Sequence, residues 1–367
     1  MAAIAIDGRK YFDYGIGTYV QQLIKSLSAL QTKHQFVLFV HPEEKNRILL
    51  PNSWRTADAD YGKYSLGEFF FFGFESNRKG VDVFHAPHYT LPIGLHGRSI
   101  VTVHDIIHLR FPDYYGLPQR MYSYAMIWHA LKHSRFVSTD SEFTKRDILK
   151  TFRIPEDKIR VIPLGVGEQY RPVKGKKFFR DFRERLGIPM PYVLYVGNIM
   201  PHKGIPVLLE AFKQIVSPAD LDLVIVGGSL LQDPALRQRA ADLEILSRVR
   251  NLGRLSDDDL VLAYNAAEVL VMPSAYEGFG LPALEAMACN TPVIVSDAAS
   301  LPEIVGSAAM IFKAGDSTEL AEALRTVLKE PSVRRDLSQK GRNHARTYTW
   351  ARTARETLAL YDQIADD

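Results

Sequence analysis

The chain has 367 residues, of which 46% are hydrophobic and 24% are charged, and this length predicts a soluble protein of two domains. Its 45 basic and 42 acidic residues give a net charge of +3, which indicates neither a nucleic-acid-binding protein nor an acidic tail. The single cysteine, Cys289, excludes an internal disulfide and a cysteine-rich metal site.

Strand-length apolar runs alternate with helical patterns along the chain, which predicts an α/β fold with parallel sheets. In the first half, the predicted strands are Ala3–Ile6, Phe36–Val40, Val81–Phe84, Ile100–Val103, Phe136–Thr139 and Ile159–Ile162. A loop at Tyr11–Gly17 precedes a predicted helix at Thr18–Leu30, and Ser141 is expected to cap a helix at Phe143–Phe152.

The second half repeats this alternation after a polar linker at Glu168–Lys177. Its predicted strands are Tyr192–Val196, Leu223–Val226, Leu270–Met272 and Pro292–Ser296. Its predicted helices are Ile205–Ile215, Ala235–Arg248, Asp257–Ala267 and Leu281–Ala288. We expect two Rossmann-like doubly wound domains that face a cleft, one at 1–170 and one at 171–349, with an amphipathic helix at 350–367 packed back on the first domain.

The start of the chain does not resemble a secretion signal, because its first apolar run, Ala2–Ile6, is short and ends at Asp7. No apolar segment approaches the roughly 20 residues that span a bilayer. We therefore expect a cytoplasmic protein, and peripheral contact with the inner face of the plasma membrane stays open.

The most informative motif joins two carboxylates across a glycine-rich turn. Glu277 lies on the turn, and Glu285 follows in a helix that we expect to begin near Pro282, which places Glu285 in its first turn. Gly278 and Gly280 disfavour an earlier helix start. Unpaired N–H groups at a helix start favour an anion such as phosphate. The motif therefore predicts a nucleotide-sugar site, and a buried loop with one charge near a helix start is the alternative.

Other predicted strands of the second half also end in glycine or polar residues, where ligands of open α/β sheets bind. Gly197, Asn198 and Lys203 follow one strand, Gly227 ends the next, and Arg254-Leu255 precedes a capped helix as a candidate border of a nucleobase. A lysine at a helix entrance is unfavourable, which favours neutralisation of a diphosphate by Lys203 over an ordinary surface role. For the glycines and for Arg254-Leu255, an ordinary turn is the alternative.

The first half carries a glycine pair and two histidines at strand ends. Gly15 and Gly17 match part of a dinucleotide fingerprint, but Val20 stands where its third glycine or alanine belongs, which argues against a nicotinamide site. The glycine loop fits a backbone approach to phosphate or sugar and a tight turn equally well. His104 and His85 are candidates for binding a sugar or phosphate, with a structural role as the alternative.

Together these residues resemble the retaining glycosyltransferases of family 4, which have the GT-B fold. The resemblance covers nearly the whole chain, and Glu277–Glu285 with Gly-Phe-Gly inside it is the specific part. The Gly15/Gly17 loop, His104 and the segment Gly197–Gly204 also match but are not specific alone. Val-His-Asp and Asn-Ile-Met-Pro-His-Lys-Gly are most similar to mannosyltransferase-type enzymes of bacterial polysaccharide assembly.

The resemblance implies transfer of a hexosyl unit from a nucleoside diphosphate sugar to a hydroxyl of a glycan or lipid-linked acceptor, with retention and without a metal or cofactor. It implies these donor-binding residues: Gly15, Gly17, Gly197, Asn198, Lys203, Gly227, Arg254, Leu255, Glu277, Gly278, Phe279, Gly280, Leu281 and Glu285. His104 would contact the donor sugar, Lys203 the diphosphate and Glu277 the sugar hydroxyls, while Glu285 would hold the ribose. Many members have an arginine where this chain has Asn198, so neutralisation would depend on Lys203.

The identity of the substrates is less accessible. GDP-mannose is the favoured donor and UDP-sugars come second, from the subfamily likeness alone. The stretch Tyr61–Phe74, with Tyr61, Tyr64 and five phenylalanines, is a candidate acceptor- or membrane-facing surface, or an aromatic core under a helix. A GT-B epimerase or phosphorylase, a two-domain sugar-binding protein without catalysis, and a dehydrogenase are the alternative functions.

Overall fold

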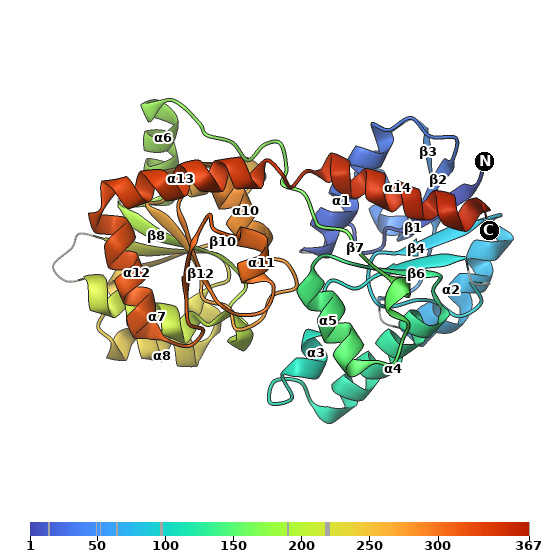
Figure 1. Ribbon diagram of the computed structural model, residues 1–367, viewed down its shortest axis with the longest axis horizontal. Helices are drawn as coiled ribbons and strands as arrows, with labels where there is room; N and C mark the ends of the chain where they lie inside the picture. Colours follow the sequence, from blue (N-terminus) through green and yellow to red (C-terminus); the bar gives the residue numbers. More distant parts are fainter. Residues whose placement is uncertain are drawn as a thin grey trace. The chain divides into compact units, whose positions relative to one another are not determined.

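The computed structural model describes residues 1–13, 15–48, 50–51, 53–63, 65–95, 98–188, 191–216 and 221–366. The chain divides into two compact units, the first unit (residues 1–165 and 349–367) and the second unit (residues 166–348). Each unit is built on a parallel sheet flanked by helices, which is the α/β Rossmann-like architecture predicted from the sequence (Figure 1). The sequence places the boundary a few residues later, at 170/171. Tyr64, part of the aromatic stretch predicted above, lies outside the described residues.

The sheet of the first unit has the strand order β3-β2-β1-β4-β5-β6-β7, with parallel pairing throughout. Its strands are β1 (Ala3–Asp7), β2 (Gln35–Val40), β3 (Trp54–Asp58), β4 (Val83–Ala86), β5 (Ser99–Thr102), β6 (Phe136–Thr139) and β7 (Ile159–Val161). The helices are α1 (Ile16–Ser28), α2 (Leu66–Arg78), α3 (Ile107–Arg110), α4 (Leu117–His133), α5 (Glu142–Thr151) and α14 (Trp350–Asp366). The order reverses between β1 and β4, which is the topological switch point of a doubly wound sheet.

The sheet of the second unit repeats this plan in the order β10-β9-β8-β11-β12-β13, again with parallel pairing. Its strands are β8 (Tyr192–Gly197), β9 (Asp222–Gly227), β10 (Val249–Gly253), β11 (Val269–Met272), β12 (Val293–Ser296) and β13 (Met310–Phe312). The helices are α6 (Lys176–Leu186), α7 (Ile205–Val216), α8 (Pro234–Asp242), α9 (Asp257–Ala266), α10 (Leu281–Ala288), α11 (Leu301–Val305), α12 (Ser317–Lys329) and α13 (Pro331–Ala345). Here the switch point lies between β8 and β11.

Each sheet is buried on both faces, which explains why its central strands read as continuous apolar runs. In the first unit, Phe39, Phe84 and Val101 belong to one core cluster. In the second unit, Phe212 and Ile225 belong to another. The two units therefore have separate hydrophobic cores.

The C-terminal helix α14 belongs to the first unit and lies beside α1 (Figure 1). Tyr361 Oη lies 2.6 Å from His85 Nδ1, and Thr353 Oγ1 donates a 2.7 Å hydrogen bond to the Pro163 carbonyl oxygen. Near the end of the helix, Asp362 Oδ1 lies 2.8 Å from His34 Nε2. These contacts attach α14 to segments of the first unit that lie far from it in the sequence.

The chain crosses between the units twice, and the two crossings run side by side. Val166 N donates a 3.0 Å hydrogen bond to the Tyr348 carbonyl oxygen. A Cβ atom at Gly165 would overlap the backbone nitrogen of Trp350, so only glycine fits there. The close approach of the two segments explains the glycine.

The prediction of one helix over Ala235–Arg248 is wrong. Helix α8 ends at Asp242, and Glu244 adopts the left-handed region with φ 57°, which a continuous α-helix does not allow. A short 3₁₀ turn, Leu246–Arg248, follows before β10 begins. Among the described residues, no helix is both long enough and apolar enough to cross a membrane.

Candidate active site

Most of the predicted donor-binding residues come together at the carboxyl edge of the second sheet. Gly197 ends β8, Gly227 ends β9, and the two glycines are paired in register. A Cβ atom at Gly227, where φ is +95°, would lie 2.8 Å from the Gly197 carbonyl oxygen. Gly228 N donates a 2.8 Å hydrogen bond to that same oxygen. Glycine at these positions lets two loops approach each other as bare backbone.

The loop after β8 packs against the loop after β11, across the switch point. Gly204 has φ +70°, and a Cβ atom there would overlap the Pro273 carbonyl oxygen. Ala275 N donates a 2.7 Å hydrogen bond to the His202 carbonyl oxygen. These contacts fix the short turn Pro201–Lys203 and direct Lys203 toward the second loop.

An ion pair between Lys203 and Glu277 joins the two loops. Lys203 Nζ donates to Glu277 Oε1 over 2.7 Å, and the two side chains are 17% and 12% exposed. Ser274 Oγ donates to the same carboxylate oxygen over 2.7 Å. The Ser300 hydroxyl donates to the Glu277 carbonyl oxygen over 2.9 Å. A cation and a carboxylate are thus held at one place, with enough exposure to meet a ligand.

Helix α10 begins at Leu281, four residues after Glu277 of this ion pair. Gly280 precedes it with φ +105°, and a Cβ atom there would lie 2.8 Å from Leu301 Cδ2. Pro282 stands in the first turn, and within α10 and its described surroundings no side chain caps the first N–H groups. Uncapped N–H groups and the positive end of the helix dipole favour an anion.

The sequence predicts that Glu285 lies in the first turn of α10. This prediction is wrong. The helix begins at Leu281, because the left-handed Gly280 already breaks the preceding chain direction, so Glu285 starts the second turn. It is buried, and Tyr264 Oη donates to its Oε2 over 2.7 Å. Burial raises the pKa of Glu285 to about 7, although hydrogen bonds from Tyr264 and Tyr170 act in the opposite direction.

The other predicted donor-binding residues of the second unit also lie at the carboxyl edge of its sheet, but among the hydrogen bonds of the described residues their side chains have no contact with the Lys203–Glu277 ion pair. Arg254 and Leu255 follow β10, which is two strands from β8. Asn198 holds the turn, since its Oδ1 accepts from Met200 N over 3.2 Å and its carbonyl oxygen accepts from the Tyr195 hydroxyl. Phe279 is buried and packs edge-on against Tyr348, with ring centroids 5.9 Å apart. For Phe279, only the backbone is available to a ligand of this edge.

In the first unit, His104 follows β5 and is held between two acceptors. Its Nδ1 lies 2.6 Å from Asp140 Oδ2, and its Nε2 lies 3.2 Å from the Pro87 carbonyl oxygen. Burial disfavours the charged imidazole, but Asp140, Asp105 and the Pro87 carbonyl outweigh it and raise the pKa of His104. Because a carbonyl and a carboxylate only accept, this arrangement favours a ring that carries both protons.

The other candidates of the first unit have structural surroundings. His85 is fully buried, with Tyr361 at one ring nitrogen and Thr102 Oγ1 2.8 Å from the other, so it does not face a ligand. Burial lowers the pKa of His85 to about 3. A Cβ atom at Gly17 would lie 2.5 Å from the Tyr11 carbonyl oxygen, whereas Gly15 precedes α1 in open space. Gly17 is therefore required by the tight turn into α1.

Sequence reasoning missed Ser274, Ser300, Tyr264 and Asp140. Ser274 precedes Glu277 by three residues, a spacing that could have indicated the contact. Asp140 follows β6, which pairs with β5, so adjacent strand ends indicate its proximity to His104. Tyr264 and Ser300 come from α9 and from the start of α11, and no local pattern marks them.

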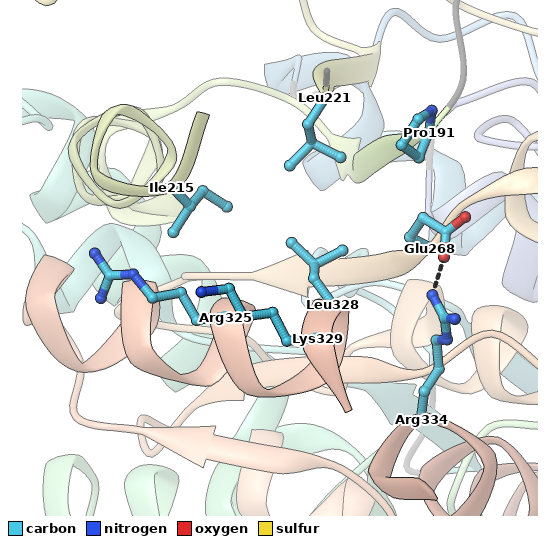
Figure 2. Close-up of a pocket in the computed structure, with 8 residues that line it drawn as sticks. All are labelled: Pro191, Ile215, Leu221, Glu268, Arg325, Leu328, Lys329 and Arg334. Atoms are coloured by element: carbon cyan, nitrogen blue, oxygen red, sulfur yellow. Dashed lines mark hydrogen bonds and ion pairs between the residues drawn. The ribbon is translucent and has the colours of Figure 1, made fainter. Parts of the chain in front are cut away.

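A cavity of about 340 Å³ lies at the opposite edge of the second sheet (Figure 2). Pro191, Leu221 and Glu268 line it and stand just before β8, β9 and β11. An ion pair between Glu268 and Arg334 closes one side. The cavity belongs to the amino edge of the sheet and is separate from the Lys203–Glu277 ion pair.

Comparison with known proteins gives matches over both units. The family model for glycosyl transferases group 1 matches residues 178–344, and the model for Glycosyltransferase Family 4 matches residues 14–169. The chain is 30% identical over 281 residues to O-antigen chain mannosyltransferase B of Escherichia coli, covering 76% of this chain and 74% of the relative. It is 33% identical over 246 residues to O-antigen chain mannosyltransferase RfbU of Salmonella typhimurium, covering 67% and 65%.

Among solved structures, sucrose-phosphate synthase of Thermosynechococcus elongatus matches with a TM-score of 0.80 and 25% identity, over 99% of both chains. This likeness extends through both units. The chain therefore belongs to the group 1 glycosyl transferases of glycosyltransferase family 4, with the GT-B fold.

Proposed function

We propose that the protein transfers a mannosyl unit from GDP-mannose to a hydroxyl of a glycan or lipid-linked acceptor, with retention of configuration and without a metal. The observation that carries the proposal is the Lys203–Glu277 ion pair beside the uncapped start of α10. A cation near a helix start that no side chain caps suits a diphosphate, and a carboxylate paired with that cation suits sugar hydroxyls. The names of the curated relatives favour mannose.

Each group has a distinct part in this proposal. Lys203 and the N–H groups of Gly280 and Leu281 bind the diphosphate, and Glu277 accepts hydrogen bonds from the donor sugar. Glu285 accepts from the ribose hydroxyls, in competition with Tyr264. His104, whose Nδ1 lies 2.6 Å from Asp140 Oδ2, contacts the donor sugar. Gly197 and Gly227, at the paired ends of β8 and β9, present their backbone to the nucleotide.

The chemical step breaks the bond between the anomeric carbon and the β-phosphate oxygen. The acceptor oxygen forms its bond to the anomeric carbon on the same face, and its proton passes to the departing phosphate oxygen. Negative charge therefore grows on the diphosphate, where Lys203 and the helix dipole stabilise it. This charge stabilisation is what a metal ion supplies elsewhere, which is our reason for proposing metal-independent transfer.

We further propose that the reaction takes place on the cytoplasmic side of the membrane, with peripheral contact to it. A lipid-linked acceptor would be available there. UDP-sugars are the second choice of donor, because backbone-lined pockets do not by themselves select a nucleobase.

The proposal is tested by assaying transfer from GDP-mannose, UDP-glucose and UDP-galactose to a soluble mannoside. Lys203→Ala should lower kcat by about a hundredfold, because a charge-stabilising contact contributes roughly 3 kcal/mol in the transition state. Glu285→Ala should mainly raise the KM for the donor. The control is Lys213→Ala, which breaks an exposed lysine–glutamate pair with Glu244 on the same unit and should change neither value.

Other results would select the alternative functions. Epimerised donor in the absence of acceptor would indicate an epimerase, and dependence on inorganic phosphate would indicate a phosphorylase. Binding of free sugar without any turnover would indicate a sugar-binding protein. Unchanged kinetics in both site variants would refute the assigned residues.

A further inference from the structure

Three buried serines hold the loop that carries Glu277. Ser274 lies on this loop after β11, Ser296 ends β12, and Ser300 precedes α11. Each of the three is at most 1% exposed. A buried hydroxyl without a hydrogen bond is costly, so the acceptor that each serine has found indicates what it holds in place.

Two of the three serines hold the backbone of the loop. Ser300 Oγ lies 2.9 Å from the Glu277 carbonyl oxygen and 3.1 Å from the Phe279 carbonyl oxygen, so its single proton is shared between them. Ser296 Oγ donates to the Ser274 carbonyl oxygen. Because β11 and β12 are paired, this second contact ties the loop after β11 to the end of the neighbouring strand.

Ser274 differs from the other two, because its hydroxyl donates to a charged side chain. Its Oγ lies 2.7 Å from Glu277 Oε1, the oxygen that also accepts from Lys203 Nζ over 2.7 Å. Among the described residues, no donor forms a hydrogen bond with Glu277 Oε2. One oxygen of the carboxylate therefore has two protein partners, and the other is left for a ligand.

The lysine alone would not maintain this arrangement. The last torsion of a glutamate side chain is broad and roughly twofold, so a carboxylate needs a donor at a defined position to keep its two oxygens distinct. In the proposed function, on which this inference rests, the diphosphate competes for Lys203. When Lys203 turns to the phosphates, Ser274 is the partner of Oε1 that stays, because the Ser296 hydroxyl holds its backbone.

We propose that Ser274 is a positioning residue of the donor site, which keeps Glu277 Oε1 occupied and thereby presents Oε2 to a hydroxyl of the donor sugar. The serine acts on the sugar through Glu277. The contacts of the diphosphate with Lys203 and with the start of α10 do not depend on its hydroxyl. Loss of this hydroxyl should therefore weaken recognition of the sugar but not of the nucleotide.

Isothermal titration of Ser274→Ala with GDP-mannose and with GDP separates these two contributions. We expect the Kd for GDP-mannose to rise about tenfold, as for loss of a hydrogen bond to a charged group, and the Kd for GDP to change by less than about twofold. Ser274→Cys, which has nearly the same size but a weak donor, should give an intermediate Kd for GDP-mannose. Equal weakening of both ligands would overturn the proposal. If the transfer assay selects a UDP-sugar, that sugar and UDP take their places.

Two other serine variants serve as comparisons. Ser300→Ala removes the donor to two carbonyl oxygens of the loop, so it should weaken GDP and GDP-mannose alike. The matched control is Ser76→Ala, which removes a buried hydroxyl from α2 of the first unit. There, Ser76 Oγ donates to the Phe72 carbonyl oxygen over 2.9 Å, and its loss should change neither affinity.

A double-mutant cycle shows whether Ser274 acts through Glu277. In a Glu277→Ala background, Ser274→Ala should change the Kd for GDP-mannose by less than about twofold, because no carboxylate remains to be positioned. A further tenfold loss in that background would mean that the serine acts on the donor by another route, and the proposal would fail.

Crystal structures of two variants test the inference without any donor or turnover. In Lys203→Ala, the Ser274 hydroxyl should keep the Glu277 carboxylate in its present orientation. In Lys203→Ala with Ser274→Ala, the carboxylate should rotate or adopt two orientations. A carboxylate that rotates already in the single variant, or stays in place in the double variant, would overturn the proposal. Failure of the unmodified protein to transfer any sugar would instead refute the proposed function, and these two structures would still decide the role of Ser274.

Discussion

The shared ion pair of Lys203 and Glu277 makes two binding contacts depend on each other. In the proposed function, the diphosphate draws Lys203 away from Glu277, whose carboxylate then needs hydroxyl donors from the sugar. A complete nucleotide sugar supplies both, but a nucleoside diphosphate compensates only the lysine. The pair therefore favours the intact donor over the nucleotide product and assists product release.

This dependence predicts an unusual result for Glu277→Gln. Because the glutamine no longer holds Lys203 by charge, the variant should bind free GDP more tightly than the unmodified protein does, by about tenfold. It should bind GDP-mannose no better, since the sugar loses its carboxylate. Isothermal titration with both ligands measures the two affinities, and parallel weakening of both would contradict the idea.

Glu285 predicts how donor binding depends on pH. Its pKa of about 7 means that part of the protein carries a neutral Glu285 at neutral pH, and ribose hydroxyls that donate to it favour the ionised form. The Kd for GDP-mannose should therefore fall as the pH rises from about 6 to about 8. Glu285→Gln should remove most of this dependence; a profile unchanged by the substitution would assign the titration to another group.

The same group affects stability with a definite sign. A carboxyl whose folded pKa lies above the unfolded value binds more protons when folded, so stability falls as the pH rises from about 4.5 toward 7. The loss from Glu285 is on the order of 3 kcal/mol, because one unit of pKa corresponds to about 1.4 kcal/mol. Thermal midpoints of the protein and of Glu285→Gln, compared across this range, isolate that contribution.

At the scale of elements, the contact between the loops after β8 and β11 controls the geometry of the site. Gly204→Ala should shift the turn that carries Lys203, because its Cβ would overlap the Pro273 carbonyl oxygen and φ is +70°. We expect at least a tenfold loss of kcat and about 1–3 kcal/mol of stability. Gly187→Ala is the control, since φ is +61° there and the space is open. Equal effects of the two substitutions on kcat would contradict a role for this contact.

Helices and strands whose ends are marked by residues such as glycine or proline could be predicted from the sequence, and those without such residues could not. Helix α10 has the predicted bounds Leu281–Ala288 because Gly280 and Pro282 define its start. Helix α4 was missed because exposed apolar side chains such as Met121 and Trp128 obscure its amphipathic periodicity. Strand β3 was missed because, at the edge of its sheet, it carries polar residues in Trp54–Asp58.

In the candidate site, too, some features could be predicted from the sequence and others could not. The motif Glu277–Glu285 and the lysine after β8 could be found because strand ends and glycines mark them. Their ion pair could not, since 74 residues separate Lys203 from Glu277 and only the sheet order brings them together. The burial of Glu285 by Tyr264 depends on the packing of α9 against α10, which no local pattern encodes.

At the scale of the whole molecule, α14 is expected to hold the first unit together. Tyr361→Phe removes the hydroxyl beside His85 Nδ1 and leaves a buried ring nitrogen without that partner. We expect a loss of about 1–3 kcal/mol, the usual penalty for an unsatisfied buried group. Hydrogen exchange should show the loosening in β1, β4 and α1 and leave the second unit unchanged; uniform loosening of both units would argue against separate cores.

The adjacent crossings at Gly165–Val166 and Tyr348–Thr349 have a consequence for the engineering of the chain. Topologically, the second unit is an insert in a first unit whose own sequence is interrupted and then resumed. Replacing residues 166–348 by a short glycine-rich turn should therefore give a self-contained domain that retains α14 and its contacts with α1.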